Sequence, residues 1–214
     1  MKKSKSIFWN NRILWAFILL TIATVLSCIK VIVLPQGGCV TYFGLLALWL
    51  ITFICGPKHG IWASILYGFI RLGVSVATGE YVNMSMGAII LEYPIAHVMF
   101  VLGALVREPN NPDVIQIDEN EAILVEPVRL KLGYLVGIVG MFVCYIISAE
   151  IFYPVYREGF WSNLWYNIVY DSSYLLIEGV ITYVVLCIPQ VAEAIFYVRY
   201  VANNVDEDDT LECF

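Results

Sequence analysis

Residues Leu132–Tyr153 read LGYLVGIVGMFVCYIISAEIFY, and this stretch decides the fold class. It holds no charged residue before Glu150. A helix that crosses the hydrocarbon core of a bilayer needs about 20 predominantly apolar residues. A spanning segment must also satisfy its own backbone hydrogen bonds, which an α-helix does. The stretch is therefore predicted to cross a membrane as an α-helix.

Five further apolar runs surround this one, and each is bounded by polar or chain-breaking residues. The runs cover residues 13–34, 40–55, 61–77, 87–106 and 166–198. Clusters rich in Gly and Pro separate the first three, namely Pro35–Gly38 and Gly56–Gly60, and such clusters mark turns. The sequence predicts an all-α, polytopic integral membrane protein with a bundle of six transmembrane helices.

The polar segments divide the chain around this membrane domain. Residues 1–12 form a basic N-terminus, and residues 13–198 form the six-helix domain with a long polar loop at 107–131. Residues 199–214 form an acidic tail. The first run could belong to a cleaved signal peptide, but it is longer than the usual apolar region and no A-x-A-like site follows it. We expect a retained first helix.

The composition excludes most soluble classes of protein. The 214 residues are 60% hydrophobic and 14% charged, whereas soluble domains carry about 25% charged residues. The mean hydropathy is +0.78. A soluble enzyme and a nucleic-acid-binding protein are therefore excluded. The net charge of −6 arises largely from acids in the loop and the tail, which are solvated segments.

Catalytic and metal-binding signatures are missing from the chain. There is no GxxxxGK[ST] phosphate loop, no HExxH and no GxSxG. The six cysteines form no CxxC pair, and they are interpreted as small buried apolar residues. We expect no enzyme activity and no cofactor or metal, so a binding or transport protein is favoured.

The distribution of Lys and Arg predicts the orientation. With six spans and a cytoplasmic N-terminus, nine cations fall on the inner side and three elsewhere. Positive charges concentrate in cytoplasmic segments. Both termini are therefore expected in the cytoplasm, with the protein in a bacterial plasma membrane. The inner cations are Lys2, Lys3, Lys5, Arg12, Lys58, Arg107, Arg129, Lys131 and Arg199.

Ionisable residues within the apolar runs are the main candidates for a functional site, because charges in a bilayer are costly and usually functional. The topology places Arg71, Glu92, Glu150 and Asp171 in the outer half of four different spans. Three structural alternatives stay open. Arg71 and Glu150 could neutralise each other, or Glu150 could face the interfacial water. His97 and Glu178 could be hydrogen-bonding contacts between helices. At 100° per residue Glu92 points about 140° away from His97, so the two do not form an obvious pair.

Aromatic residues are concentrated in the outer segment that precedes the last run. They are Phe152, Tyr153, Tyr156, Phe160, Trp161, Trp165 and Tyr166. They could form the aromatic belt found at membrane interfaces. They could also form a lid, because aromatic faces attract cations and stack on flat rings. Above Glu92 and Asp171, such a lid would suit a flat, positively charged ligand that enters from outside.

With these features the chain resembles the thiamine-specific substrate-binding subunit, or S component, of energy-coupling factor (ECF) transporters. The resemblance covers about Pro35 to Ala192. It rests on Leu91-Glu92-Tyr93 in LEYPIAHVMFVLGALVR, on the turn Lys58-His59-Gly60, and on the spacing of aromatic residues and Asp171 downstream.

The resemblance implies a six-helix subunit with a thiamine pocket near the outer face. It implies that Glu92 hydrogen-bonds the aminopyrimidine, with Tyr93 beside it. It also implies that Tyr153 and Trp161 stack on the rings and that Tyr166 lines the pocket. The implied partners are the lipid bilayer, a transmembrane coupling subunit and two ATPase subunits.

The chain departs from the family pattern in four places. Tyr145 stands where the family has a pocket histidine, Asp171 where it has an asparagine, and Arg71 near a family tryptophan. These three residues complete the expected substrate-binding set. In the first span the family's Ala-x-x-x-Ala coupling face reads Ala16-Phe17-Ile18-Leu19-Leu20, so the second alanine is lost.

Three functions follow as hypotheses. The first is a thiamine-type S component that binds the vitamin, or a related flat cation, from outside and delivers it with an ATP-driven coupling module. The second is a self-sufficient ion-coupled carrier, with Asp171 and Glu178 two helical turns apart on a proton path. The third is a membrane-embedded assembly factor without a ligand.

Overall fold

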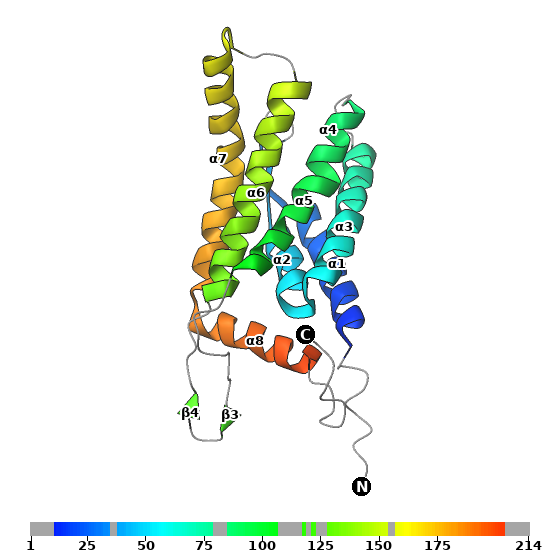
Figure 1. The fold of residues 1–214 in the computed structure, drawn as a ribbon, viewed down its shortest axis with the longest axis vertical. Coiled ribbons are helices and arrows are strands. Elements are labelled where there is room, and N and C mark those ends of the chain that lie inside the picture. Colours follow the sequence, from blue (N-terminus) through cyan, green and yellow to red (C-terminus); the bar gives the residue numbers. More distant parts are fainter. Residues whose placement is uncertain are drawn as a thin grey trace.

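The computed structural model describes residues 11–34, 38–78, 85–106, 117–118, 121–122, 128–153 and 157–203. Most of the helices run side by side, and one, α8 (Pro189–Asn203), lies across the lower end of this bundle (Figure 1). The expected basic N-terminus lies almost wholly outside the described residues, as do Tyr156, most of the 107–131 loop and the tail beyond Asn203.

The upright helices follow the apolar runs, with differences at their ends. They are α1 (Arg12–Cys28), α2 (Gly44–Cys55), α3 (Pro57–Ala77), the segment Met86–Leu105, α6 (Val128–Phe152) and α7 (Phe160–Leu186). The segment Met86–Leu105 consists of α4 (Met86–Ile90), η2 (Leu91–Ile95), α5 (Ala96–Val98) and η3 (Met99–Leu105). Two short strands, β3 (Ile117–Asp118) and β4 (Glu121–Ala122), pair antiparallel.

Four of these helices are long and apolar enough to cross a membrane: α3, Met86–Leu105, α6 and α7. The apolar helices α1 and α2 have 17 and 12 residues, about 25 and 18 Å at 1.5 Å per residue. They pack against each other and against α3. The all-α membrane fold is confirmed, whereas of the six expected spans four are supported by length and two stay predictions.

The first expected helix is wrong in its last six residues. Residues 13–34 were expected to be one helix, but α1 ends at Cys28, and β1 (Lys30–Val33) and β2 (Cys39–Thr41) follow. These strands pair antiparallel with a register shift between Lys30 and Ile32. Residues 29–33 read IKVIV, a run of mostly β-branched residues that favours a strand over a helix.

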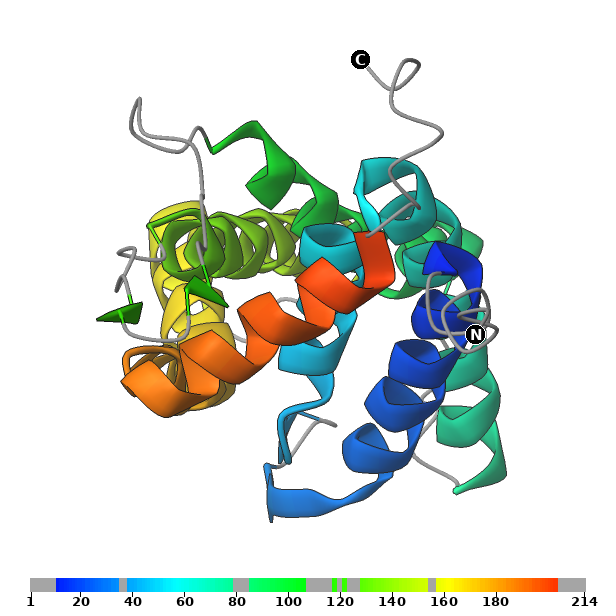
Figure 2. The ribbon, with the colours of Figure 1, turned by 90° about the horizontal axis from the view of Figure 1, so that it is seen from below.

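The last expected helix is also wrong, because residues 166–198 form two helices. Helix α7 ends at Leu186, and α8 begins at Pro189. Proline lacks the amide hydrogen that a continuing helix needs, but it is well suited to a first helical turn. Helix α8 crosses beneath the bundle from α7 toward α1 (Figure 2).

Local signals set the remaining helix ends. The Asn11 side chain caps α1 by accepting from the amides of Ile13 and Leu14 at 2.9 and 3.3 Å. Ser85 Oγ caps α4 by accepting from the Ala88 amide at 3.2 Å. The expected turn at 56–60 is a single residue, Gly56, with φ of 92°, because α3 already begins at Pro57.

The core is packed around the buried ring of Trp49 in α2. Its indole nitrogen donates to the carbonyl oxygen of Leu130 at 3.0 Å. A Cβ added to Gly103 or Gly133 would come within 2.5 Å of the ring. The absence of side chains at these two glycines therefore lets η3 and α6 pack closely against each other and against the same edge of the indole.

Candidate substrate-binding site

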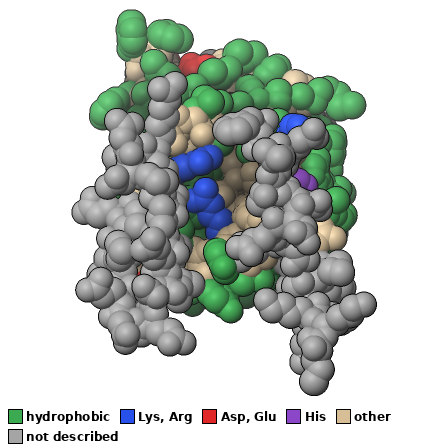
Figure 3. All heavy atoms as spheres, turned by 60° about the horizontal axis from the view of Figure 1, so that its bottom comes forward, with side chains coloured by type: hydrophobic (Ala, Val, Ile, Leu, Met, Phe, Trp, Pro, Cys, Tyr) green, Lys and Arg blue, Asp and Glu red, His purple; other side chains and the backbone are tan. Residues whose placement is uncertain are grey.

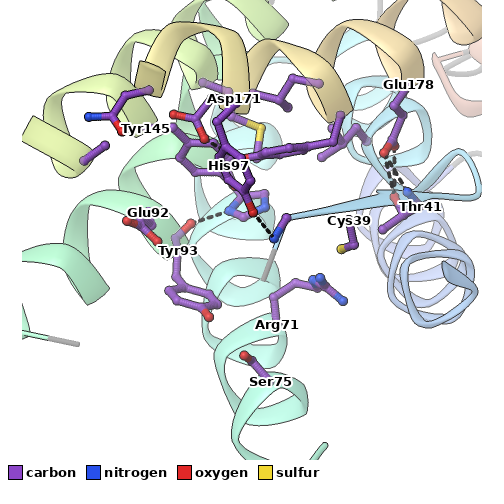
Figure 4. Close-up of a pocket in the computed structure, with 18 of the residues that line it drawn as sticks. Cys39, Thr41, Arg71, Ser75, Glu92, Tyr93, His97, Tyr145, Asp171 and Glu178 are labelled. Carbon is purple, nitrogen blue, oxygen red and sulfur yellow. Dashed lines mark hydrogen bonds between the residues drawn. The ribbon is translucent and has the colours of Figure 1, made fainter. Parts of the chain in front are cut away.

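A cavity of about 200 Å³ lies among α3, η2, α6, α7 and the hairpin β1–β2. Its polar lining includes one guanidinium and three carboxylates, drawn in Figure 4. Glu92 and Tyr93 lie on one side of it, and Glu178 with Thr41 lies on the other. The lining residues are Gly38, Cys39, Thr41, Leu45, Tyr67, Arg71, Ser75, Glu92, Tyr93, His97, Met141, Tyr145, Ala149, Tyr153, Asn167, Tyr170, Asp171, Tyr174, Leu175 and Glu178.

Several of the charged and polar residues that line the cavity lie near the helix ends that are uppermost in Figure 1. Arg71 is six residues from the upper end of α3, and Glu92 six residues from that of α4. Tyr145 is seven residues from the upper end of α6. At 1.5 Å per residue these positions are about 9–10 Å below the helix ends. Of the four ionisable residues that the sequence placed in one layer, Arg71, Glu92 and Asp171 line this one cavity, whereas Glu150 does not.

Glu92 owes its position to a π-helical turn. In η2 the amide of Ala96 donates to the carbonyl of Leu91, five residues back. Pro94 lies in this turn and has no amide to donate. Turns of this kind are rare and occur often at functional sites. Glu92, Tyr93 and His97 all line one cavity. The contacts of Glu92 are with Ser148 and Tyr153, and that of His97 Nδ1 is with the Tyr93 carbonyl oxygen, so these contacts do not join Glu92 and His97 as a pair.

The Glu92 carboxylate is held by two hydroxyl donors. Ser148 Oγ donates to Oε1 at 2.7 Å, and the Tyr153 hydroxyl donates to Oε2 at 3.2 Å. A carboxylate offers about four acceptor positions, so two remain for a ligand. The arrangement fixes the direction of the carboxylate and keeps capacity for two further donors.

A row of three tyrosines runs along α7, and two of them, Tyr170 and Tyr174, line one wall of the cavity. Tyr166, Tyr170 and Tyr174 are spaced four residues apart, and successive ring centroids are 6.4 and 5.9 Å apart. The Tyr174 hydroxyl donates to Asp171 Oδ1 at 2.9 Å, and its ring lies 6.4 Å from that of Tyr145. The wall therefore combines flat aromatic surfaces with a buried carboxylate.

Two contacts attach the β1–β2 hairpin to α7 across the cavity. The Gly38 amide donates to the Tyr170 hydroxyl at 3.0 Å. The backbone amide and the hydroxyl of Thr41 both donate to Glu178, at 2.9–3.0 Å. By these bonds Glu178 joins α7 to strand β2, where the structural alternative had expected another helix, and it also lines the cavity.

Arg71 and Glu150 have separate hydrogen-bond partners, and only Arg71 lines the cavity. Arg71 Nη1 donates to the carbonyl oxygen of Ser27 at 3.1 Å, in the last turn of α1. Glu150 accepts from the side chains of Asn163 and Asn167. The alternative in which Arg71 and Glu150 neutralise each other therefore finds no support in these contacts.

Six of the eight expected site residues line the cavity, and two do not. Trp161 is 78% exposed, and Tyr166 packs on Tyr170 and beneath the Arg157 guanidinium, 5.3 Å from its ring centroid. The expected loop at 154–165 is helical from Phe160 onward, and this turns Trp161 outward. The six are Arg71, Glu92, Tyr93, Tyr145, Tyr153 and Asp171.

Several lining residues were not predicted as ligand contacts. Asn167 and Tyr174 lie four residues before and three residues after Asp171 on α7, and this spacing, which puts side chains on one helix face, was a usable signal. Cys39 and Thr41 enter through the hairpin, in a region expected to hold a turn and the start of a helix.

Comparison with known proteins identifies the family. A family model described as thiamine transporter protein (Thia_YuaJ) matches residues 13–198. The chain belongs to the thiamine transporter protein family. It is accordingly a multi-pass membrane protein of a transport family, in agreement with its apolar helices.

A solved structure supports the fold of this family member. ThiT from Listeria monocytogenes matches with a TM-score of 0.57 at 15% identity, over 86% of this chain and 96% of that chain. At this identity the likeness establishes the fold alone. The search of curated proteins found no match.

Removing the Tyr153 hydroxyl tests its part in the site. Tyr153→Phe takes away one of the two donors that orient Glu92 but leaves the carboxylate itself in place, and a typical intramolecular hydrogen bond contributes about 0.5–1.5 kcal/mol. We expect thiamine affinity to fall about two- to tenfold in calorimetric titrations. Tyr200→Phe on exposed α8 is the matched control and should match the parent. Equal affinity for Tyr153→Phe and the parent would remove Tyr153 from the site.

Proposed function

We propose that this protein is the substrate-binding S component of an energy-coupling factor transporter and that its cavity binds thiamine. The observation that carries the proposal is the Glu92 carboxylate, held by Ser148 and Tyr153 in a cavity walled by tyrosines. Thiamine combines a flat aminopyrimidine, which offers N–H donors, with a flat cationic thiazolium. Carboxylates and aromatic faces are the groups that recognise these features.

The charges of the cavity agree with a cationic ligand. Glu92, Asp171 and Glu178 line it together with one guanidinium, that of Arg71. Glu178 is engaged by Thr41, and Asp171 accepts from one tyrosine hydroxyl. Asp171 therefore keeps acceptor capacity on the wall of stacked rings, where a thiazolium would lie.

We also propose an orientation of the protein in the membrane. The described cations Arg12, Lys58, Arg129, Lys131 and Arg199 belong to the end of the bundle that α8 covers. Basic side chains gather near the middle of this face in Figure 3. By the positive-inside rule this end lies on the cytoplasmic side of the cell membrane, and the cavity opens toward the outer side.

Coupling to a transmembrane subunit and two ATPase subunits rests on the family resemblance. The structure alters one expectation about docking. Ala16 and Leu20, the positions of the small-residue face, are 0% and 4% exposed in a bundle where α1 packs on α2 and α3. The lost alanine therefore changes internal packing, and docking through α1 would use its exposed side, which includes Phe17.

Reconstitution distinguishes this function from that of an ion-coupled carrier. The carrier alternative is favoured by Asp171 and Glu178, which are buried on one helix and line one cavity. We expect the protein alone in liposomes to bind thiamine without accumulating it. Accumulation driven by a proton or sodium gradient, and abolished by an uncoupler, would establish the carrier instead.

Asp171→Asn should reduce selectivity for cationic ligands. Two unit charges 4 Å apart interact by about 4 kcal/mol at an effective dielectric constant of 20, and desolvation cancels much of this. We expect the variant to lose roughly 1–2 kcal/mol more for thiamine than for a neutral analogue of the same shape, measured by calorimetry. Equal losses for both ligands would make Asp171 a packing or hydrogen-bonding residue.

A further inference from the structure

Asn167 is a buried amide on α7 that lines the cavity, 5% exposed. We propose that Asn167 Oδ1 accepts a hydrogen bond from an amine of the ligand, and that Glu150 is the positioning residue that orients this amide. The inference rests on the proposed function and adds to it a specificity-determining contact.

The hydrogen bond to Glu150 decides which way the amide faces. Asn167 Nδ2 donates to Glu150 Oε1 at 2.7 Å. An ionised carboxylate only accepts, so it binds the nitrogen and excludes the oxygen of the amide. With the nitrogen turned to Glu150, the carbonyl oxygen is the atom that Asn167 can offer to the cavity. The orientation thus follows from the chemistry of the partner.

Glu150 is itself held in place. Asn163, one helical turn before Asn167, donates through Nδ2 to both carboxylate oxygens at 3.2 and 3.3 Å. Its Oδ1 accepts from the Arg157 backbone amide at 3.4 Å. Two side-chain amides of α7 therefore hold one carboxylate near the end of α6. Tyr153, whose hydroxyl donates to Glu92, directly follows this end of α6.

The ligand chemistry that fits is a primary amine on a flat ring. Such an amine has two N–H groups, and the cavity offers an acceptor from each of two elements, Glu92 from η2 and Asn167 from α7. A carbonyl oxygen in place of the amine would face both acceptors without a hydrogen to donate. A site built around a donor rejects such an analogue because its polar groups are left unpaired.

The test compares thiamine with oxythiamine, in which a ring carbonyl replaces the amine, by calorimetry on the full-length protein. The parent should prefer thiamine at least tenfold. Asn167→Ala should lower this ratio three- to tenfold. Glu150→Gln should lower it in the same direction, because the new amide can donate to Asn167 Oδ1 and turn the Asn167 nitrogen toward the cavity.

The controls are Gln190→Ala and Glu158→Gln, which change an exposed amide and an exposed carboxylate and should keep the parent's ratio. Melting curves establish that each variant is folded. Equal weakening of both ligands in Asn167→Ala and in Glu150→Gln would make the network purely structural and overturn the inference. Failure of the folded parent to bind thiamine would instead overturn the proposed function, and the inference with it.

Discussion

Glu92→Gln is expected to weaken thiamine binding by about 10- to 100-fold. The amide keeps the shape of the side chain but loses the charge, and hydrogen bonds to charged groups contribute about 1.5–3 kcal/mol. The amide also turns an N–H₂ group toward one of the two hydroxyls that hold the carboxylate, Ser148 or Tyr153. Calorimetric titration of purified protein measures the loss directly.

Two variants sharpen this prediction. Glu178→Gln changes a carboxylate that lines the same cavity but is engaged by Thr41, and it should weaken binding less than Glu92→Gln does. Glu193→Gln changes an exposed carboxylate on α8 and should have no effect. If Glu92→Gln binds as tightly as the Glu193→Gln control, the ligand contact lies elsewhere.

The second large effect is expected at Gly68, where α3 meets the π-helical turn. A Cβ added there would lie 2.6 Å from the backbone carbon and oxygen of Tyr93 and 2.8 Å from the nitrogen of Pro94. Backbone atoms cannot rotate away as a side chain can. Gly68→Ala should therefore push η2 from α3, cost about 1–3 kcal/mol of stability and weaken thiamine binding by displacing Glu92.

Gly73 supplies the matched control on the same helix. Nothing lies within 4 Å of a Cβ added at this position. Replacing a helical glycine by alanine stabilises a helix by about 0.5–1 kcal/mol, so Gly73→Ala should melt at or above the parent temperature. Thermal melting in detergent compares the two variants. A Gly68→Ala protein that melts and binds like Gly73→Ala would contradict the close approach of α3 and η2.

The membrane fold was predictable because it depends on a summed property of the sequence. About 20 apolar residues suffice to predict a span, whatever their order, and runs such as Leu132–Tyr153 meet this condition. The layer of polar groups was predictable for a related reason. Positions along a helix convert directly into height in the bundle, so Arg71, Glu92 and Asp171 could be expected near one another before any contact was known.

The errors arose where local conformation departs from an unbroken α-helix. The π-helical turn at Leu91–Ile95 changes which side chains share a face, and a uniform 100° spacing does not anticipate it. Apolar content alone also did not distinguish β1 from the end of α1, although the β-branched residues Val31–Val33 were a usable signal. The break before Pro189 was readable too, since proline commonly begins a helix.

The aromatic lid was overestimated for a different reason. Aromatic residues are common both in binding sites and at membrane interfaces, and composition does not separate these roles. The structure distinguishes the two roles by where each side chain lies, in the cavity or on the outer surface of the bundle. Tyr153, Tyr170 and Tyr174 line the cavity, whereas Trp161 and Trp165 are exposed at 78% and 67%. Tryptophan fluorescence from these two residues is therefore a poor reporter of binding, and calorimetry is preferred.

The cavity lined by Glu92 is expected to bind thiamine without help from ATP or a partner subunit. Isothermal titration of thiamine into the purified, folded protein, in detergent and without nucleotide, tests this claim most directly. We expect saturable binding of one thiamine per chain with a micromolar or lower dissociation constant. A titration that shows no binding at micromolar thiamine, with a melting curve that shows the protein to be folded, would contradict it.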